Sequence, residues 1–474
     1  MSLKSSVKKC VKRLVARGLR WRHPVRRDLP AECWGLEYSD RSLTLRGHRL
    51  SDIAAEFGTP IHVVDEERLV RNFTALSQNT DDGACDLFYS YKTNPLPGVL
   101  KRLHALGAGA EVVSEYELWL AQKLGVPPER IIYNGPAKSL RSLETAVSLG
   151  ILLINLNHFE EIDRLAGLCR RLGQKTRVAI RVTTGGGWQG QFGIPIAGGK
   201  ALAAYRHALD HDELDLVGIH CHRGVLFENL AEVDSYMDEV LAFLHELWAA
   251  VGSLPEILDL GGSVCVPTVR PLTRRDLRLS RAYSVDPLPP RRDERPGLEE
   301  FPRKMVQRVE SFCGARNLPV PRIVFEPGRA LTGDSQMLLT RVVTTRAGSN
   351  ERHYAILDAG VSLAGIVKSE FHQLLRLQAP SPGERQKTYR IVGPLCHAWD
   401  VLYPAWTTGE LHEGDGLAIM DAGAYFIPEE RSFSFTRPGC VSVGRDGTLA
   451  AIRRSEKFDD VVALDSNFRD EKTR

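Results

Sequence analysis

The chain has 474 residues, of which 43% are hydrophobic and 26% charged, and its formal net charge is +3 at pH 7. This length exceeds one ordinary domain, so we expect a large domain and a smaller second one. The nearly balanced charge gives no reason to expect a nucleic-acid partner, and no apolar run reaches the roughly 18 residues of a membrane span. The nine cysteines form no Cys-x-x-Cys pair, which argues against a zinc site and suits a reducing, cytoplasmic compartment.

Residues 1–37 form a basic N-terminal extension, with ten Lys and Arg residues before its first acid. If the segment is helical, Val7, Val11, Leu14 and Val15 share one face, which gives a basic amphipathic helix. Such a segment can be a solvated tail, an organellar transit peptide, or a contact with an anionic surface or a partner. We favour the solvated tail, and no apolar segment follows that would make a secretory signal.

From about residue 86, short apolar runs rich in β-forming residues alternate with longer stretches of helical periodicity. The predicted strands are Asp86–Tyr91, Ala110–Ser114, Arg130–Asn134, Leu152–Asn157, Arg177–Thr183, Leu216–His222, Ile257–Gly261 and Arg322–Glu326. Eight strand–helix repeats predict an α/β fold of the closed (β/α)8 TIM-barrel type, with a doubly wound open sheet as the alternative. We assign residues 67–334 to this barrel.

Beyond residue 335 the pattern changes to short strands separated by Gly, Pro and Asp turns. The strands predicted there are Val342–Thr345, Tyr354–Leu357, Tyr389–Val392, Leu417–Met420 and Val441–Val443. We therefore assign 335–474 to a C-terminal antiparallel β domain, and we expect residues 38–66, with the strand-like Ile61–Val64, to join it. An insertion at 267–297, rich in Arg and Pro, interrupts the barrel, and a loop of this length is usually functional or disordered. We expect a lid or a disordered segment.

A TIM barrel forms its active site where the strands reach their C-terminal ends. A random set of strand ends would be mostly Gly, Asn and Pro turns, whereas here many ends carry chemically capable side chains. These positions are Lys92, Ser114, Asn134, Arg181, His222, the Gly261-Gly262-Ser263 loop, and Glu326 with Arg329. Their concentration at one end of the predicted barrel indicates a catalytic site.

Lys92 ends the first barrel strand, where it is either a Schiff-base lysine for a carbonyl cofactor or a surface lysine with an extended side chain. Loops after strands seven and eight of a barrel commonly bind phosphate. Gly261 and Gly262 would let backbone N–H groups approach a phosphate, and Arg329 would add charge-assisted hydrogen bonds. Glu326 either pairs with a protonated ring nitrogen or forms a structural salt bridge.

His220 and His222 lie two residues apart in the sixth strand, so both point to the same side. No carboxylate or third histidine sits at ligand spacing in the sequence, and we therefore predict no metal site. We interpret His222 as a ring that stacks on a flat cofactor and His220 as a core histidine.

The predicted β domain contributes three further candidates. Cys396, within the Gly393–Asp400 turn, is either an inert buried thiol or a proton donor. The Tyr425 hydroxyl lies in a turn-rich loop and could bond a phosphate, and the Phe433 ring could line a pocket.

Taken together, these segments resemble the fold-type III pyridoxal-phosphate decarboxylases, the family of diaminopimelate and ornithine decarboxylases. The matching motifs follow the family's order and span about residues 50–440. They are Tyr-Ser-Tyr-Lys-Thr-Asn (89–94), Gly-Ala-Gly-Ala-Glu-Val-Val-Ser (107–114), Arg-Ile-Ile-Tyr-Asn-Gly-Pro-Ala-Lys (130–138), Gln-Phe-Gly-Ile (191–194), Gly-Ile-His-Cys-His-Arg-Gly (218–224), Asp-Leu-Gly-Gly (259–262), Glu-Pro-Gly-Arg (326–329), Gly-Pro-Leu-Cys (393–396) and Gly-Ala-Tyr (423–425).

The resemblance implies a pyridoxal 5'-phosphate (PLP) cofactor and a head-to-tail homodimer with its sites at the interface. Lys92 would form the internal aldimine, and Cys396 of the second subunit would protonate the quinonoid after carbon dioxide leaves. Glu326 would keep the ring nitrogen protonated, which favours decarboxylation over the racemisation of related alanine racemases, which have an arginine there. The remaining cofactor contacts would come from Arg181, His222, Gly261, Gly262, Ser263, Arg329 and Tyr425.

The chain departs from the family where substrate is selected. Val225 stands where the family has a phosphate-binding serine, and His397 replaces the acid that reads a distal amino group. Asp358-Ala359-Gly360 is followed by no Arg-Pro pair, which in diaminopimelate decarboxylases grips a distal carboxylate. We predict substrate contacts from four residues of the β domain: His397, Asp400, Asp358 and Phe433.

These departures leave three functions open. The first is a decarboxylase for an amino acid or an amino-acid conjugate of secondary metabolism. The second is a decarboxylase for diaminopimelate or another diamino acid, although the lost Arg-Pro pair argues against diaminopimelate. The third is a catalytically inactive relative that acts as a binding protein, which the retained Lys92, His222, Glu326 and Cys396 disfavour.

Overall fold

The computed structural model describes residues 18, 26–77, 85–188, 190–292, 295–348 and 352–465. The basic helix expected within residues 1–27 lies almost wholly outside these residues. The chain divides into two units. We call them the barrel unit (69–266 and 293–332) and the sheet unit (1–68, 267–292 and 333–474).

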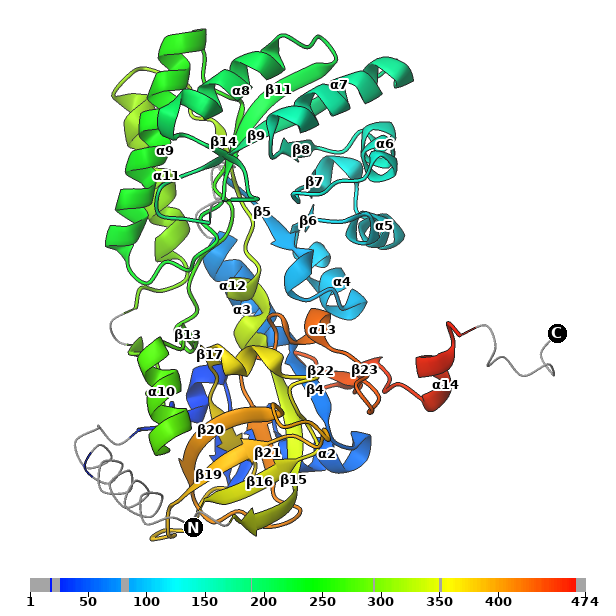
Figure 1. The fold of residues 1–474 in the computed structure, drawn as a ribbon, viewed down its shortest axis with the longest axis vertical. Coiled ribbons are helices and arrows are strands. Elements are labelled where there is room, and N and C mark those ends of the chain that lie inside the picture. The colour runs from blue at the N-terminus through cyan, green and yellow to red at the C-terminus, as the bar shows by residue number, and fades with distance from the viewer. Residues whose placement is uncertain are drawn as a thin grey trace, which may run out of the picture. The chain divides into compact units, whose positions relative to one another are not determined.

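The barrel unit contains eight parallel strands that close on themselves (Figure 1). In spatial order around the barrel they are β9 (Thr176–Thr183), β11 (Leu214–Cys221), β12 (Ile257–Asp259), β14 (Arg322–Phe325), β5 (Cys85–Ser90), β6 (Gly109–Val112), β7 (Ile131–Tyr133) and β8 (Leu153–Leu156). Pairing of β8 with β9 completes the ring, and the short β10 (Ile194–Pro195) adds to β9. All eight predicted strands are present within a residue or two of their predicted bounds, and the TIM-barrel prediction is confirmed.

Helices follow the barrel strands and surround the ring. They are α4 (Pro97–Ala105), α5 (Glu115–Lys123), α6 (Leu140–Leu149), α7 (Phe159–Leu172), α8 (Lys200–Leu209), α9 (Leu230–Val251), α11 (Glu300–Gly314) and the short α12 (Arg329–Thr332). In α9 the predicted apolar face is buried, including Val240, Leu244 and Leu247. The Asn229 side chain accepts a hydrogen bond from the Glu232 N–H at 3.0 Å, and such an N-cap stabilises a helix by about 1 kcal/mol.

The sheet unit is built on a nine-stranded sheet of largely antiparallel strands. Its strands are β4 (Ile61–Asp65), β15 (Gln336–Ala347), β16 (His353–Leu357), β18 (Leu374–Arg376), β19 (Lys387–Val392), β20 (Val401–Thr408), β21 (Gly416–Ile419), β22 (Cys440–Val443) and β23 (Leu449–Arg453). As expected, β4 joins this sheet, between β15 and β22. Two pairings are parallel, β16 with β19 and β4 with β22, because their connections cross over other strands.

Smaller elements complete the sheet unit. They are a three-stranded sheet of β1 (Glu37–Ser39), β2 (Ser42–Leu45) and β3 (His48–Arg49), the helices α2 (Leu50–Phe57), α13 (Phe426–Glu429) and α14 (Phe458–Val462), and the strands β13 (Arg270–Pro271) and β17 (Glu370–Phe371). Helix α3 (Glu66–Ser77) begins in this unit and ends in the barrel unit. No helix among the described residues is long and apolar enough to cross a membrane.

The insertion at 267–297 contains regular structure. Its β13 pairs with β17 of the sheet unit, and residues Arg274–Tyr283 form helix α10. The helix starts at a capping box, in which Thr273 and Asp276 satisfy each other's backbone N–H groups. The expectation of disorder is therefore wrong for residues 267–292, because the Arg-rich composition hid a well-capped helix.

Candidate active site

The C-terminal ends of the barrel strands bring the predicted cofactor residues together. Lys92 lies in a short 3-10 turn (Tyr91–Thr93) directly after β5, and Arg181 lies inside β9. His222 follows β11 and Glu326 follows β14. Because parallel strands of a barrel end at one rim, residues far apart in the sequence share one small volume.

Lys92 is held by a buried carboxylate that the sequence analysis did not nominate. Its Nζ lies 3.3 Å from Oε2 of Glu111, which is in β6. The Ser90 hydroxyl donates to the same oxygen. The Glu111 side chain is fully buried, whereas the Lys92 side chain is 37% exposed, so the amine is anchored and still accessible.

Asn134, at the end of β7, connects Glu111 to Glu326. Its Nδ2 donates to Oε1 of Glu111 at 2.8 Å and to Oε1 of Glu326 at 2.7 Å. Asn155 Nδ2 donates in turn to Asn134 Oδ1 at 2.6 Å, which fixes the orientation of the amide. A continuous polar network therefore runs from Lys92 to Glu326 across the mouth of the barrel.

Glu326 lies among groups that keep it ionised. Its Oε2 lies 3.3 Å from Nε2 of His220. Burial favours the protonated form, but hydrogen bonds from His220 and Asp259 outweigh it and hold the pKa of Glu326 well below its usual range. Burial and the neighbouring Glu326 charge raise the pKa of Asp259 well above normal, so Asp259 is the partner that keeps its proton.

His222 is a neutral ring at the opening of the site. Burial, reinforced by the positive charges of Lys92 and Arg181, lowers its pKa well below normal. The Gly262 N–H donates to His222 Nδ1 at 3.1 Å, which requires that nitrogen to be unprotonated. Gly261 has a φ of 65°, and a Cβ there would meet His222 Nδ1 at 2.4 Å. The glycine loop thus fits closely around the imidazole and sets its tautomer.

Arg181 supplies a positive charge near the carboxylates of Glu111 and Glu326. Burial lowers its pKa, and the carboxylates of Glu326 and Glu111 oppose that shift. Its guanidinium lies 5.0 Å from the centroid of the Phe192 ring. Its Nε is buried without a hydrogen-bond partner among the described residues, so this side of the site retains an unused donor.

The glycine loops form a cradle suited to an anion. The Gly224 N–H donates to Ser263 Oγ at 3.0 Å, and both residues have positive φ angles, 76° and 70°. A Cβ at Gly262 would come within 2.5 Å of the Glu326 carbonyl oxygen, so the backbone there is closely approached. Arg329 begins the short α12 next to this loop. A closely approached glycine loop with an adjacent arginine fits a phosphate. In this structure the Gly261 and Gly262 N–H groups donate to Asp259 and His222.

The structure also tests the argument against a metal. One ligand atom from each of His220, His222 and Glu326 lies within 4.8 Å of the others, so the premise that no carboxylate accompanies the histidines is wrong. Glu326 comes from a distant strand and could not be found by sequence spacing. The Nδ1 of His222 is, however, occupied by the Gly262 N–H, and the adjacent Arg181 disfavours a cation. A second group with close ligand atoms, Asp163 with His207 and His211, lies on helices α7 and α8 and the turn after α8.

The predicted sheet-unit residues form their own neighbourhood. Cys396 is exposed, and every other described cysteine is buried. The His397 and Phe433 rings meet edge to face with centroids 6.2 Å apart. Tyr425 adopts a φ of 68° in the turn before α13. These residues lie in the sheet unit, so their predicted contacts with the cofactor and substrate stay predictions.

Asp400 and Asp358 have structural partners. Asp400 is buried and accepts from the backbone N–H groups of Val361 and Leu395, both at 2.8 Å. Asp358 accepts from the hydroxyls of Thr59 and Thr340, both at 2.6 Å. The Asp400 carboxylate thus shapes the loop that carries Cys396 and His397, whereas Asp358 ties Thr59 to Thr340. The substrate contacts predicted for both stay predictions.

Sequence reasoning missed Glu111, Asp259 and the connecting role of Asn134. A signal existed for Glu111: a charged residue inside the apolar run Gly109–Val112 must point inward or be paired. Asn134 was noted only as a polar strand end. Its role depends on two carboxylates from other strands, which no local pattern reveals.

Comparison with known proteins agrees with this geometry. The family model described as "Pyridoxal-dependent decarboxylase, pyridoxal binding domain" matches residues 66–333. The diaminopimelate decarboxylase of Aquifex aeolicus is 29% identical over 441 residues, covering 90% of this chain and 96% of that protein. The diaminopimelate decarboxylase of Vibrio cholerae is also 29% identical, covering 88% and 95%.

Solved structures show the same architecture. A crystal structure of an Aquifex aeolicus protein superposes with a TM-score of 0.77 at 28% identity, covering 92% of this chain and 99% of that one. A diaminopimelate decarboxylase structure from M. jannaschi gives a TM-score of 0.79 at 23% identity, covering 91% and 97%. The second likeness supports the fold, a closed barrel with a separate sheet domain.

Proposed function

Because the chain belongs to the pyridoxal-dependent decarboxylases and is thus a PLP-dependent amino-acid decarboxylase, we propose that Lys92, His222 and Glu326 form its catalytic centre. The observation that carries this assignment is the network Lys92–Glu111–Asn134–Glu326. It joins an accessible amine to a buried, ionised carboxylate at the end of the barrel where such sites form.

The described residues provide a place for each part of PLP. Lys92 would hold the cofactor through its Nζ, and the neutral imidazole of His222 would lie against the ring. Gly261, Gly262 and Ser263 would bind the phosphate. Arg329 and Tyr425 would add donors to the same group, and Arg181 would support the ring from below.

When bound, PLP supplies an electron-withdrawing ring that stabilises the negative charge left on the substrate's Cα as carbon dioxide departs. The ionised Glu326 would hold a proton on the ring nitrogen, which strengthens that withdrawal. Asp259, which keeps its own proton, would donate to Glu326 and fix its orientation. Glu111 would hold the Lys92 amine at the site.

We further propose that Cys396 returns a proton to Cα after carbon dioxide leaves, and that the enzyme is a homodimer in which this thiol comes from the partner. Two observations support this role. Cys396 is exposed on a loop, between Leu395 and His397, that Asp400 fixes through the Leu395 N–H. A proton donor must reach solvent and substrate, and the buried cysteines cannot.

We propose as substrate an amino acid, free or conjugated, whose distal group differs from that of diaminopimelate. The Arg-Pro pair after Gly360 is missing, and His397 stands in place of the acid. Both changes alter the groups that would meet the far end of the substrate.

Diaminopimelate remains a second candidate because of a groove in the sheet unit. This groove is lined by Arg346, Arg352 and Arg390 together with His397. Its arginines could bind a distal carboxylate in place of the missing one. The proteins of Aquifex aeolicus and Vibrio cholerae that are 29% identical to this chain are named diaminopimelate decarboxylases, which also supports this candidate.

The assignment of the catalytic centre is tested with Lys92→Ala and, as a matched control, the exposed Lys101→Ala on α4. We expect Lys92→Ala to lose the visible absorbance of the bound cofactor and all release of carbon dioxide, while Lys101→Ala behaves as wild type. Borohydride reduction followed by peptide mapping should place the cofactor on Lys92. An unchanged spectrum in Lys92→Ala would overturn the assignment, and a wild-type protein that never binds PLP would favour a binding protein that has lost the chemistry.

The substrate is tested by measuring carbon dioxide release from a panel of meso-diaminopimelate, lysine, ornithine and N-acylated diamino acids. Preference for a conjugate or for an amino acid without a distal carboxylate supports the first proposal. Preference for diaminopimelate that is lost in Arg352→Gln supports the second.

A further inference from the structure

The sheet unit contains a partly open cavity of about 130 Å³ between helix α10 and strand β20. Its wall includes the rings of Phe371, Tyr403 and Trp406 and the side chain of Leu277. A cavity of roughly 150 Å³ in another protein's core holds one benzene molecule, so this volume suits a ligand body of about one ring. Helix α10 comes from the 267–292 segment, which therefore builds one side of the cavity.

Two buried hydroxyl groups line this cavity without a partner. Ser280 is 3% exposed and Tyr403 is 4% exposed, and neither Ser280 Oγ nor Tyr403 Oη has a hydrogen-bond partner among the described residues. A buried polar group without a partner costs free energy, and such groups are rare in folded proteins. Burial raises the pKa of Tyr403, so its hydroxyl stays a donor. Both groups can bond to a polar ligand atom.

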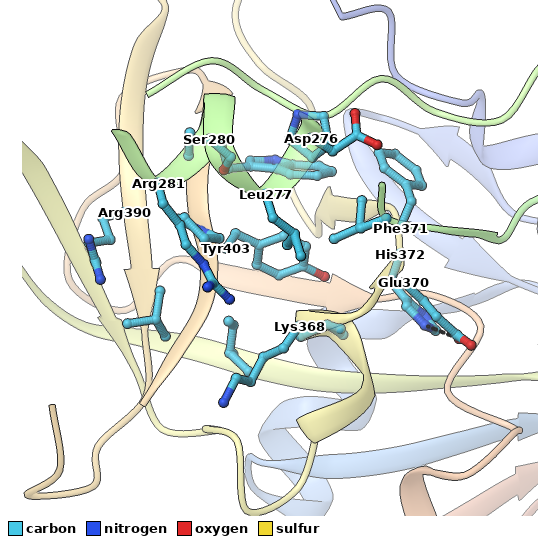
Figure 2. Close-up of a pocket in the computed structure, with 18 of the residues that line it drawn as sticks. Asp276, Leu277, Ser280, Arg281, Lys368, Glu370, Phe371, His372, Arg390 and Tyr403 are labelled. Atoms are coloured by element: carbon cyan, nitrogen blue, oxygen red, sulfur yellow. Dashed lines mark ion pairs between the residues drawn. The ribbon is translucent and has the colours of Figure 1, made fainter. Parts of the chain in front are cut away.

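The side chains that line the cavity carry an excess of positive charge. Its two lining acids are engaged: Asp276 lies 2.8 Å from Arg270, and Glu370 lies 3.4 Å from His372. The three lining cations form no ion pair within the described part of the chain; they are Arg281, Lys368 and Arg390. Figure 2 shows these three on one side of the cavity and Phe371 and His372 on the other.

Some of these cations also lie close enough to repel one another. Burial lowers the pKa of Arg390, and the nearby positive charges of Arg352 and Arg281 lower it further. A ligand carboxylate would relieve this repulsion and gain charge-assisted hydrogen bonds. A cationic ligand would increase the repulsion.

The aromatic wall is fixed before any ligand arrives. The guanidinium of Arg26 lies 3.5 Å from the centroid of the Trp406 ring. Its Nη2 donates to the Thr407 carbonyl at 2.6 Å, and Asp286 lies 3.7 Å from its Nη1. The Arg26 contact therefore holds Trp406 in place, and a preformed wall lowers the entropy cost of binding.

We propose that this cavity is a second binding site, which takes a small aromatic or branched aliphatic monocarboxylate. The apolar body lies against Phe371, Tyr403 and Trp406, and the carboxylate lies toward Arg281 and Lys368. The hydroxyls of Ser280 and Tyr403 supply the remaining hydrogen bonds. This inference does not rest on the proposed decarboxylase reaction, because all residues of the cavity belong to the sheet unit.

The test uses the full-length holoenzyme and three probes of one shape, benzoate, benzyl alcohol and benzylamine, with binding followed by calorimetry and by tryptophan fluorescence. We expect benzoate to bind, benzyl alcohol to bind more weakly, and benzylamine not to bind. The double variants Arg281→Gln/Lys368→Gln and Ser280→Ala/Tyr403→Phe should each weaken benzoate binding by about tenfold or more, as loss of a good polar contact does. Arg278→Gln, an exposed arginine of α10 outside the cavity, is the matched control and should bind as wild type.

Three outcomes would overturn the proposal: no benzoate binding at millimolar concentration, equal binding of benzylamine, or unchanged affinity in both double variants. The probe series on the wild-type protein decides the question even if a double variant fails to fold. Visible cofactor absorbance, measured in the same samples, should be unchanged by benzoate and by both double variants. Failure of the second site is thereby distinguished from failure of the catalytic assignment.

Discussion

Lys92 and Glu111 form an ion pair at the end of the barrel, with Nζ 3.3 Å from Oε2. The carboxylate is completely buried and the lysine is partly exposed. Glu111 cannot move without breaking its bonds to Ser90 and Asn134. The pair therefore fixes the position of a long, partly exposed side chain by tying it to a buried partner.

Glu111→Gln should impair positioning of Lys92 without removing it. The amide keeps the shape but loses the charge, and it turns an N–H group toward Asn134 Nδ2 or toward Lys92. We expect kcat/KM to fall by roughly 10- to 100-fold, as misplacement of a reacting group does, while cofactor still binds. Steady-state kinetics of carbon dioxide release and the visible spectrum measure both effects. Wild-type kinetics would show that Glu111 has only a structural role.

Gly262→Ala should disrupt the cofactor cradle. A Cβ there would come within 2.5 Å of the Glu326 carbonyl oxygen, so the backbone must shift. We expect a loss of about 1–3 kcal/mol of stability, typical of overpacking, and weaker PLP binding by equilibrium dialysis. Gly314→Ala is the control, because a Cβ at Gly314 meets nothing within 4 Å. Equal behaviour of the two variants would refute the close approach.

Glu117 should make stability depend on pH. Burial and the neighbouring Glu111 charge raise the pKa of Glu117 from 4.5 to about 7. The folded state therefore binds the proton more tightly than the unfolded state, and the free energy of unfolding falls as the pH rises from 4.5 to about 7. At about 1.4 kcal/mol for each pH unit, the loss from this residue is about 3 kcal/mol by pH 8.

Glu117→Gln removes this dependence because the amide cannot ionise, while its oxygen can still accept from the Val113 N–H. Urea unfolding at pH 5 and pH 8 should show the variant gaining stability over wild type at pH 8 only. The exposed Glu144→Gln on α6 serves as the control and should follow wild type at both values. A wild-type difference between the two pH values that persists in Glu117→Gln would assign it to another group.

Cys396 should be the first thiol to react with iodoacetamide, since it is exposed and the other described cysteines are buried. We expect alkylation to track loss of activity, and Cys396→Ala to slow proton return and increase abortive transamination. Mass mapping and product analysis measure these effects. Cys440→Ala, which removes a buried thiol, should leave the product ratio unchanged. Full activity of Cys396→Ala with unchanged products would exclude the proposed role.

Mixing of two impaired variants tests the shared site. Lys92→Ala and Cys396→Ala are combined, dissociated and allowed to reassociate. In a random mixture half of the dimers are mixed, and each carries one site with both native residues, so about a quarter of the sites should recover. Recovered activity would show that Lys92 and Cys396 of one site come from different subunits. No recovery would show that they come from the same subunit.

Much of this protein was predictable from local patterns. The eight barrel strands follow from apolar runs at regular spacing, and β4 could be placed with the second sheet from its position and composition. Lys92, His222 and Glu326 were found because each ends a strand, and strand ends of a barrel meet at one rim. Helix α10 escaped prediction because its hydrophobic side chains are few and its arginines dominate the composition.

The sequence by itself determined which strands form and which reactive residues stand at their ends, because these depend on short-range periodicity. Only the tertiary structure decided that Asn134 joins Glu111 to Glu326, that the pKa of Asp259 is raised while that of Glu326 is lowered, and that Arg281 approaches Arg390. Each of these facts depends on side chains from strands or helices far apart in the chain. The strength of a charge interaction depends on distance and burial in space, which sequence separation does not encode.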